Sequence, residues 1–275
     1  MRVLVTGASG TIGSAVAAAL VRHGHEVVGT VTMDGRPVPD GVRPLTVDLF
    51  DPKALPTDVD AAVHAASSND ERAGELDDAV VGALLDAFAG TGKPLVYTSG
   101  LGLHGSRGDE VITENTPLDP PMVLSWRPAI ERRVLDGAAR GVRTVAIRSG
   151  MVHGNGRGYV PLVLASQGNV VRHIGDGDNR WALVHGDDLG DLYVRALEAE
   201  PGSVYLAAAE SVAVRDIAKV VAERTGARVE PWDPADAKQH WGVLVDLFLA
   251  DQVASSAKAH EELGWRPHRP SVLAE

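Results

Sequence analysis

Three glycines near the N-terminus have a spacing that suits phosphate binding. Gly7, Gly10 and Gly13 follow a short apolar run, residues 3–5, and precede an alanine-rich segment. Glycine lets a backbone turn tightly and approach a phosphate closely, and a helix that starts there offers free N–H groups and the positive end of its dipole. A strand, a glycine turn and a helix in this order predict a dinucleotide site. The alternative is a turn of the same shape without a ligand. The residues predicted to touch the dinucleotide here are Gly7, Ser9, Gly10, Thr11, Ile12 and Gly13.

The end of the second expected strand bears on which nicotinamide cofactor is bound. An acidic residue at that point binds the adenosine ribose 2′-hydroxyl and selects NAD. Counting from Gly13, the position falls near Val31, which has no carboxylate, and Asp34 lies in the turn that follows. Thr32 and Arg36 can instead bind a 2′-phosphate. We therefore expect NADP in preference to NAD.

The elements that must position these residues alternate along the first two thirds of the chain. Short apolar strands that alternate with helices predict an α/β fold, a doubly wound parallel sheet of the Rossmann type, with ligands outside the carboxyl ends of the strands. The expected strands are residues 2–5, 26–31, 43–47, 61–65, 94–98 and 143–148, and the expected helices are residues 12–23, 76–89 and 129–140.

The alternation loosens after residue 148. Residues 150–158 contain four glycines, which indicates a flexible loop near the site. We expect residues 1–152 to form a dinucleotide-binding domain that residues 181–198 rejoin. Residues 153–180 and 199–275 are expected to form a smaller substrate-binding lobe.

Composition excludes several classes of function. The 275-residue chain has a formal net charge of −11, which disfavours a nucleic-acid partner, because phosphate binding needs a basic surface. It has no cysteine, so disulfides, thiolate nucleophiles and zinc–thiolate sites are excluded. There is no apolar run of about 18 residues, so no membrane span is expected. Because the first strand begins next to Met1, we expect no signal peptide and a cytoplasmic location.

A series of short motifs extends over nearly the whole chain. The motifs are TGASGTIG (residues 6–13), DL (48–49), HAA (64–66), YTSG (97–100), ENTPLDP (114–120), RSGMVHG (148–154), HGDDL (185–189) and LGWRP (263–267). In type and order they resemble the extended short-chain dehydrogenase/reductases, the NAD(P)-dependent epimerase/dehydratase family. The resemblance implies that Asp48 and Leu49 lie at the adenine, that Ala65 and Ala66 make room for the cofactor, and that Ser99 lies in the active site.

The resemblance fails at the catalytic pair. The family has a tyrosine and, four residues later, a lysine on a helix that leads to a glutamate four residues further on. Alignment on Glu131 puts Val123 at the tyrosine and Arg127 at the lysine, and no tyrosine stands between positions 97 and 159. Arg127 can hold the cofactor ribose and supply positive charge, but it cannot release a proton near neutral pH. The alternative role for Arg127 is that of a solvated residue on the helix surface. Ser99 can hydrogen-bond a substrate oxygen, and its alternative role is to cap a helix or loop.

Three side chains are candidates for the missing acid–base group. His104 follows Ser99 in the loop that the family lays over its substrate, and an imidazole there exchanges a proton near pH 7. His153 lies in the glycine-rich loop, and Tyr159 lies just past it. The alternatives are an ordinary loop position for His104 and a packing role for Tyr159. The cluster of His185 with two aspartates resembles a metal site only superficially, and the family likeness implies structural roles there, so no metal is expected.

These observations predict an atypical NAD(P)-dependent oxidoreductase or epimerase that acts on a carbonyl, imine or alcohol. The C-terminal lobe is shorter than nucleotide-sugar substrates require in the family, so the expected substrate is a smaller metabolite or natural product. Two alternatives remain: a non-redox isomerase, lyase or cyclase on the same fold, and a redox-silent NAD(P)-binding protein that regulates a partner. The resemblance also implies a homodimer through residues 76–89 and 129–140.

Overall fold

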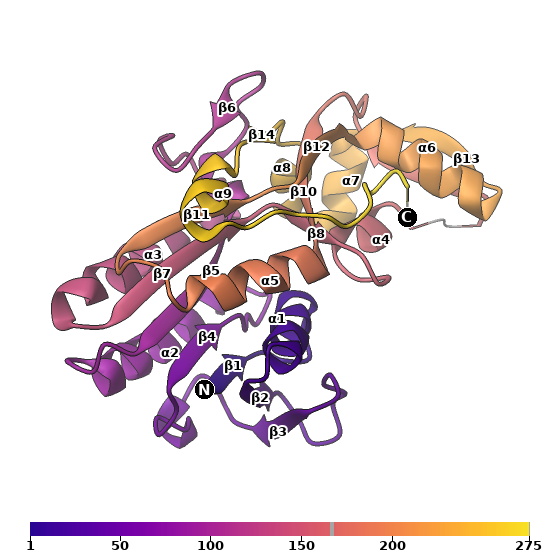
Figure 1. The fold of residues 1–275 in the computed structure, drawn as a ribbon. Coiled ribbons are helices and arrows are strands. Elements are labelled where there is room, and N and C mark those ends of the chain that lie inside the picture. Colours follow the sequence, from indigo (N-terminus) through magenta and orange to yellow (C-terminus); the bar gives the residue numbers. More distant parts are fainter. Residues whose placement is uncertain (166–167, 275) are drawn as a thin grey trace.

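A central parallel sheet organises the computed structural model, which describes residues 1–165 and 168–274 (Figure 1). Seven strands lie in the order β11-β7-β5-β4-β1-β2-β3, and every neighbouring pair is parallel. This order confirms the predicted doubly wound sheet, with the chain reversing its direction of growth between β1 and β4. The strands are β1 (Arg2–Thr6), β2 (Glu26–Val31), β3 (Val42–Thr46), β4 (Ala61–His64), β5 (Pro94–Gly100), β7 (Arg143–Ser149) and β11 (Ser203–Ala207).

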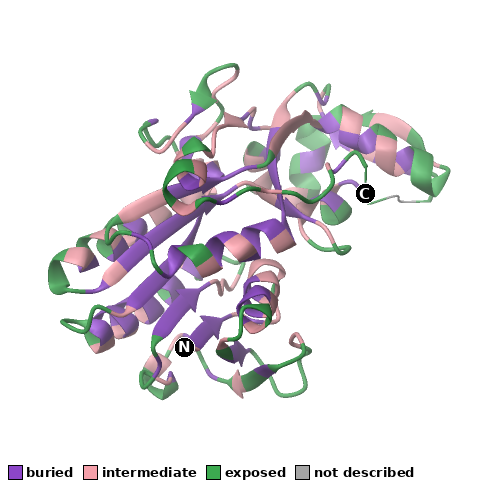
Figure 2. Ribbon diagram, viewed as in Figure 1, coloured by how far each residue is buried: buried purple, intermediate pink, exposed green. Residues whose placement is uncertain are grey.

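Helices cover both faces of this sheet, so its strands are buried between two apolar layers (Figure 2). One face packs against α1 (Thr11–Arg22), α5 (Gly186–Ala196) and α9 (Ala257–Leu263), and the other against α2 (Ala73–Phe88) and α3 (Arg127–Asp136). The helices α1 and α5 approach closely because Gly190 has no side chain: a Cβ there would lie 2.6 Å from the Ala15 carbonyl oxygen.

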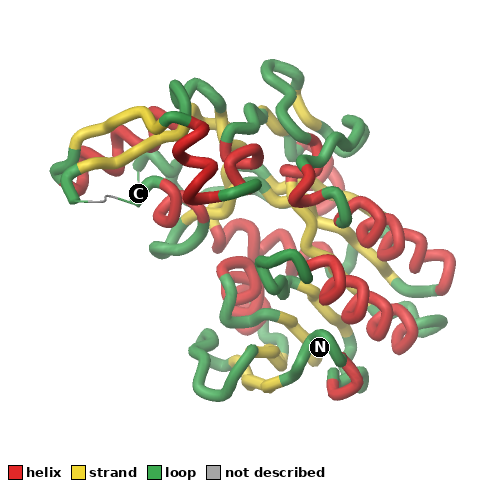
Figure 3. The backbone as a smooth tube through the Cα atoms, turned by 180° about the vertical axis from the view of Figure 1, so that it is seen from behind, coloured by secondary structure: helices red, strands yellow, loops and turns green. Residues whose placement is uncertain are grey.

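The remaining elements form three smaller sheets and a third apolar core. The strand order β12-β10-β8 joins β8 (Met151–His153), β10 (Arg180–His185) and β12 (Glu210–Ala213). The other two pairs are β9 (Val170–Ile174) with β13 (Arg228–Trp232), and β6 (Val111–Ile112) with β14 (Val253–Ala254). Four helices, α4 (Tyr159–Val163), α6 (Val214–Thr225), α7 (Pro234–Trp241) and α8 (Leu244–Phe248), pack with β9, β10 and β13 around a core that includes Trp181, Ile217 and Phe248. Figure 3 shows this group from behind, at the end of the molecule away from the N-terminus.

Short 3-10 turns complete the chain at η1 (Pro52–Ala54), η2 (Leu101–His104), η3 (Met122–Leu124) and η4 (Gly137–Arg140). Within the two described stretches, none of the helices has the length and apolar run that crossing a membrane requires.

The chain does not divide between sheet and lobe entirely where the sequence suggests. Strand β11, which falls in the stretch 199–275 expected in the lobe, pairs with β7 at the edge of the large sheet. Conversely, β10 lies in the three-stranded sheet, while the helix that follows it, α5, packs on α1 in the main body. A single apolar strand carries no local sign of which sheet it will join, so this pairing is decided by the tertiary fold.

Candidate functional site

The glycine turn after β1 is closed so tightly that side chains would not fit. Gly7 has a left-handed backbone with φ of +70°, and a Cβ at Gly13 would lie 2.1 Å from the Gly7 carbonyl oxygen. Helix α1 then begins at Thr11, and its N-cap, Gly10, provides no side-chain hydrogen bond; its first turn contains no acidic residue. The first-turn N–H groups and the dipole of α1 therefore have no side-chain cap and no neighbouring acid in that turn, which is the arrangement that suits an anion.

Two threonine hydroxyls fix the walls of this turn. Thr30 Oγ1 accepts a hydrogen bond from Gly7 N at 3.0 Å. Thr6 Oγ1 accepts from the backbone N–H groups of Ala65 and Ala66 at 3.1 and 3.3 Å. A Cβ at Gly7 would lie only 2.7 Å from Ala66 Cα, so the end of β4 rests directly on the turn. Thr30, a further candidate for the 2′-phosphate from the sequence, is engaged with the turn in this way. Thr6 was not singled out from the sequence, because its partners come from strands that are far apart in the chain.

The residues predicted to lie beyond the ends of β2 and β3 are mostly exposed. Thr32 and Arg36 follow β2 on the surface, and the carboxylate of Asp34 accepts a hydrogen bond from the Thr46 hydroxyl of β3. Asp48 is exposed and caps the backbone N–H of Phe50 at 2.9 Å, while Leu49 is buried beside it. These groups follow the strands that flank β1, at the same edge of the sheet as the glycine turn.

The carboxyl end of β5 brings Ser99 and Arg127 together. Arg127 begins α3, and its Nη1 donates to the Thr98 carbonyl oxygen at 3.0 Å, with the guanidinium 4.5 Å from the centre of the Trp126 ring. Ser99 is 3% exposed. Among the described residues, neither Ser99 Oγ nor Arg127 Nε has a hydrogen-bond partner, although both atoms are buried. Buried polar atoms are nearly always satisfied in proteins, so two such atoms at one strand end indicate a place for a polar ligand.

The surroundings of Arg127 and Val123 explain how this end of α3 is held. Val123 lies in η3, before α3 begins, and its carbonyl oxygen accepts from Trp126 Nε1 at 3.1 Å. On the opposite side, Tyr193 of α5 donates its hydroxyl to Thr98 Oγ1 at 2.7 Å. Burial raises the pKa of Tyr193, while the hydrogen bond to Thr98 and, to a smaller extent, the charge of Arg127 lower it.

His104 is enclosed rather than open to the groove. It is fully buried in η2, where Arg148 Nη1 donates to its Nε2 at 3.2 Å and its Nδ1 faces the Pro117 carbonyl oxygen at 3.4 Å. Burial and the neighbouring Arg148 lower the pKa of His104 to about 4. Arg148 in turn forms a buried ion pair with Glu131 of α3, at 2.5 Å between Nη2 and Oε1. In this arrangement His104 is a neutral hydrogen-bonding partner of Arg148.

His153 and Tyr159 flank the glycine-rich stretch of residues 154–158. His153 is buried at the end of β8, with its ring 5.5 Å from that of His185, edge to face. Tyr159 is half-buried at the start of α4 and packs edge-on against Phe248 at 5.6 Å. Burial raises the pKa of Tyr159 and Arg127 lowers it, so these two side chains are within electrostatic reach of each other.

Arg157 is the residue of this loop that the sequence reasoning missed. Its Nη1 donates to the Ser9 carbonyl oxygen and to Ser14 Oγ, both at 3.2 Å, and so connects the loop to the first turn of α1. A cleft of about 270 Å³ opens between α1, residues 37–39 and this loop. The only sign in the sequence is a single arginine among glycines, and nothing local indicates that the loop folds onto the N-terminal turn.

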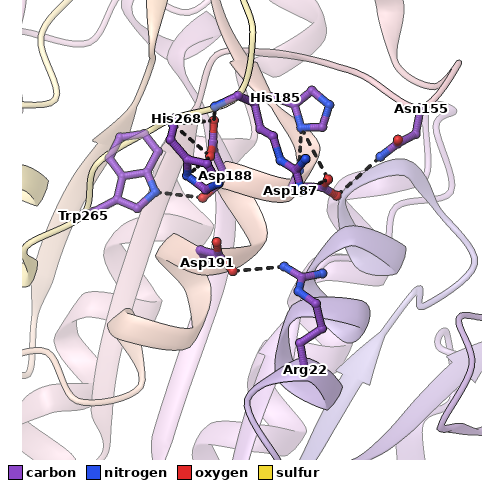
Figure 4. Close-up of polar contacts among 9 residues, drawn as sticks. Arg22, Asn155, His185, Asp187, Asp188, Asp191, Trp265 and His268 are labelled. Atoms are coloured by element: carbon purple, nitrogen blue, oxygen red, sulfur yellow. Dashed lines mark hydrogen bonds and ion pairs between the residues drawn. The ribbon is translucent and has the colours of Figure 1, made fainter.

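The acidic start of α5 holds the C-terminal segment in place (Figure 4). Asp188 accepts from the backbone N–H groups of His268 and Arg269 at 3.0 to 3.2 Å, and its side chain is 2% exposed. Asp187 forms an ion pair with Arg269 at 2.8 Å and accepts from Asn155. The two carboxylates thus have separate structural partners, and no group of residues suited to a metal ion occurs in the part of the chain that the structure describes.

Comparison with known proteins agrees with this geometry. Residues 3–208 match the model of the NAD dependent epimerase/dehydratase family. An uncharacterized protein of Schizosaccharomyces pombe is 33% identical over 100% of this chain and 98% of its own length. The 2′-dehydrokanamycin reductase of Streptomyces kanamyceticus is 29% identical over 91% of this chain and 74% of its own length. Among solved structures, the UDP-glucose 4-epimerase of Thermus thermophilus in complex with NAD superposes with a TM-score of 0.79, at 25% identity over 99% of this chain and 96% of that one.

Proposed function

This chain belongs to the NAD dependent epimerase/dehydratase family, and we propose that it is an oxidoreductase that acts on the carbonyl, imine or alcohol carbon of a small molecule. The observation that carries the proposal is the pair of buried, unsatisfied polar atoms at the end of β5, Ser99 Oγ and Arg127 Nε. A protein that only binds a dinucleotide for structural reasons has no need to leave two such atoms beside the strand end where the family carries its active site.

The glycine turn leaves no room for side chains at Gly7 and Gly13, because backbone atoms close that space. A turn of bare backbone lets the pyrophosphate of a dinucleotide approach closely, so the turn fits this group. We assign the pyrophosphate to the N–H groups of Thr11, Ile12 and Gly13, with Ser9 and Gly10 in the turn, because the Gly10 N–H already donates to the Gly7 carbonyl oxygen at 2.9 Å. When bound, the nicotinamide ring supplies or accepts the hydride. Asp48 and Leu49 would lie at the adenine, Ala65 and Ala66 along the groove wall, and Arg127 at the nicotinamide ribose.

We further propose that the cofactor is NADP(H), although the solved relative from Thermus thermophilus contains NAD. Val31 ends β2 without a carboxylate, and the nearest acid, Asp34, is engaged by Thr46. Thr32 and Arg36 then supply a hydroxyl and a cation for a 2′-phosphate. Equal affinity for NAD⁺ and NADP⁺ would contradict this assignment.

At the reacting end, Ser99 would donate a hydrogen bond to the substrate oxygen and Arg127 would stabilise negative charge on it. For the proton we propose Tyr159. His104 is enclosed and His153 is buried against His185, whereas Tyr159 is half-buried and within electrostatic reach of Arg127. A phenol is protonated near neutral pH; burial raises the pKa of Tyr159, while the charge of Arg127 lowers it, and that lowering is the effect that would favour proton donation in a reduction.

The test combines binding with a redox assay. Calorimetry measures dinucleotide binding, and absorbance near 340 nm follows NADPH against a panel of aldehydes, ketones and imines. Ser99→Ala should lower kcat by about 10²-fold, the effect of removing one oxyanion donor, with the cofactor Kd unchanged. Ser125→Ala, an exposed serine at the end of η3, is the matched control. Tyr159→Phe should also lower kcat without changing the cofactor Kd.

Two outcomes would contradict the proposal. Wild-type protein that binds the dinucleotide but never changes its absorbance across the panel would favour a redox-silent role. Turnover of a substrate without any change at 340 nm, with no deuterium incorporated from 4-deuterated NADPH, would favour a non-redox isomerase or lyase.

A further inference from the structure

Four buried side chains, from β1, β4, α2 and β5, form a chain of polar contacts that ends beside the glycine turn. Thr6 Oγ1 lies 2.7 Å from His64 Nδ1, His64 Nε2 lies 3.3 Å from Asp77 Oδ1, and Tyr97 donates its hydroxyl to Asp77 Oδ2 at 2.6 Å. All four residues are at most 1% exposed. The chemistry proposed above gives none of them a role.

We propose that Asp77, acting through His64 and Thr6, positions the backbone of Ala65 and Ala66 against the glycine turn and thereby sets the affinity for the dinucleotide. The inference rests on the proposed function, because it concerns the same groove. It assigns positioning roles to Thr6, His64, Asp77 and Tyr97, none of which touches the cofactor or the substrate.

The positions of the hydrogens follow from the partners. Thr6 Oγ1 already accepts from Ala65 N and Ala66 N, so its own hydrogen goes to His64 Nδ1, which must be the acceptor nitrogen. A neutral imidazole then carries its proton on Nε2, the nitrogen beside Asp77. Asp77 is left as a carboxylate with the Tyr97 hydroxyl on its other oxygen. This arrangement of protons fixes the direction in which the Thr6 oxygen lone pairs point. The contact between His64 Nε2 and Asp77 Oδ1 is a contact at ion-pair distance rather than a hydrogen bond, because neither atom has a hydrogen-bond partner among the described residues.

The Thr6 end of this chain is the part that lies against the glycine turn. The two N–H groups held by Thr6 belong to the residues that follow β4, and Ala66 Cα lies so near Gly7 that a single methyl group there would overlap it at 2.7 Å. A contact this close leaves no slack. If Thr6 loses its partner or rotates, the backbone of Ala65 and Ala66 must shift, and this shift displaces the adjoining glycine turn because the two are in close contact.

A buried charge is a costly way to achieve stability alone, which points to a positioning role. Well-packed apolar residues of similar volume usually stabilise a protein as much as a buried ionic group does. Burial raises the pKa of Asp77, but His64, Arg127 and Tyr97 together outweigh that effect and keep it below its usual value. The influence of Arg127 also connects this chain with the reacting end of the site, since Arg127 binds Thr98, the residue next to Tyr97.

The experiment compares dinucleotide Kd and Tm for matched variants of the full-length protein. Thr6→Val removes the hydroxyl and keeps the shape, and Asp77→Asn removes the charge; each should raise the Kd for NADP⁺ about tenfold, a loss of about 1.4 kcal/mol in binding. Thr6→Ser keeps the hydroxyl and should restore binding to within about threefold of wild type, a difference of under about 0.7 kcal/mol. Asp86→Asn, an exposed carboxylate on the same helix, should leave Kd unchanged.

The outcomes separate this inference from the proposed function. Wild-type protein that binds neither NADP⁺ nor NAD⁺ refutes the proposed function itself. Wild type that binds, together with Thr6→Val and Asp77→Asn variants that melt earlier but bind equally well, refutes only the positioning role. If both variants fail to fold, Tyr97→Phe, which removes one hydroxyl, takes their place with an expected two- to fivefold rise in Kd, and an unchanged Kd in it overturns the inference.

Discussion

The buried ion pair between Glu131 of α3 and Arg148 should make a large contribution to the free energy of unfolding. Arg148 Nε and Nη2 lie 2.5 to 3.2 Å from the Glu131 carboxylate, and the two side chains are 7% and 3% exposed. Glu131→Gln keeps the shape of the side chain but leaves a buried guanidinium with only a neutral amide and the imidazole of His104 around it. Removing one partner of a buried pair costs about 3–5 kcal/mol of stability.

The expected change in Tm follows from the length of the chain. Unfolding entropy is about 2.1 cal/mol/K per residue, so 275 residues that unfold in one step have about 0.6 kcal/mol/K. A loss of about 3–5 kcal/mol should therefore lower Tm by about 5–8 °C, as measured by scanning calorimetry or circular dichroism. Because Glu131 lies one turn after Arg127 on α3, we also expect weaker cofactor binding in this variant.

The control is a pair of the same chemistry in an exposed place. Asp86 pairs with Arg140 at 2.8 Å, with side chains 76% and 44% exposed. Exposed pairs contribute about 0–1 kcal/mol, so Asp86→Asn should change Tm by less than about 2 °C. Replacing both members of the buried pair, as Glu131→Leu with Arg148→Met, should recover most of the lost stability. A Glu131→Gln protein that melts as Asp86→Asn does would refute the reasoning, because the buried cation would then have found another partner.

Three further predictions concern the pH dependence of stability and the cofactor turn. The pKa of His104 is about 4 in the folded protein and 6.5 when the side chain is exposed, so the unfolded chain takes up the proton first as the pH falls. The free energy of unfolding should therefore be full above pH 6.5 and decrease between pH 6.5 and 4. Urea titrations of His104→Gln should show a smaller decrease over the same range. Gly13→Ala should abolish NADP⁺ binding in calorimetry, because its Cβ would lie 2.1 Å from backbone, whereas Gly24→Ala, whose Cβ meets no atom within 4 Å but whose φ of +79° strains an alanine, should lower Tm and leave the Kd unchanged. Arg36→Ala should raise the Kd for NADP⁺ about tenfold and leave that for NAD⁺ within twofold, and an equal effect on both would refute the assignment of the 2′-phosphate.

The large sheet could be predicted from the sequence because its signals are local. Each of the first strands is a short apolar run next to a turn, and the expected boundaries differ from the observed ones by one or two residues, as for β3 and β5. The glycine turn is equally local: Gly7 and Gly13 lie within one strand–turn–helix unit, and their close approach needs no information from elsewhere in the chain.

The polar interior could not be predicted, because its partners are distant in sequence. His104 stands in a glycine-containing loop and is a candidate for the acid–base group from the sequence alone, yet it is buried against Arg148, 44 residues away, which Glu131 holds in an ion pair. Asp77 looks like one of several acidic residues on an amphipathic helix until His64 and Tyr97 are brought to it by β4 and β5. Arg157 is similar, since its contact with Ser9 spans 148 positions. The order of the strands in the sheet determines which of these distant residues meet, and a short stretch of sequence carries no information about that order.

Successive residues of β5 connect the two positioning systems of the site. Side chains alternate between the faces of a strand, so Tyr97 reaches Asp77 of α2 on one face and Thr98 reaches Tyr193 of α5 on the other. Ser99 follows at the strand end, and the Thr98 carbonyl oxygen accepts from Arg127. The geometry of this site therefore depends on the backbone of β5 and its buried partners, and not on the side chain at position 123. A chain built in this way can keep the buried support of Ser99 and Arg127 while position 123 varies, which is the physical ground for our proposal that the proton comes from another residue, Tyr159.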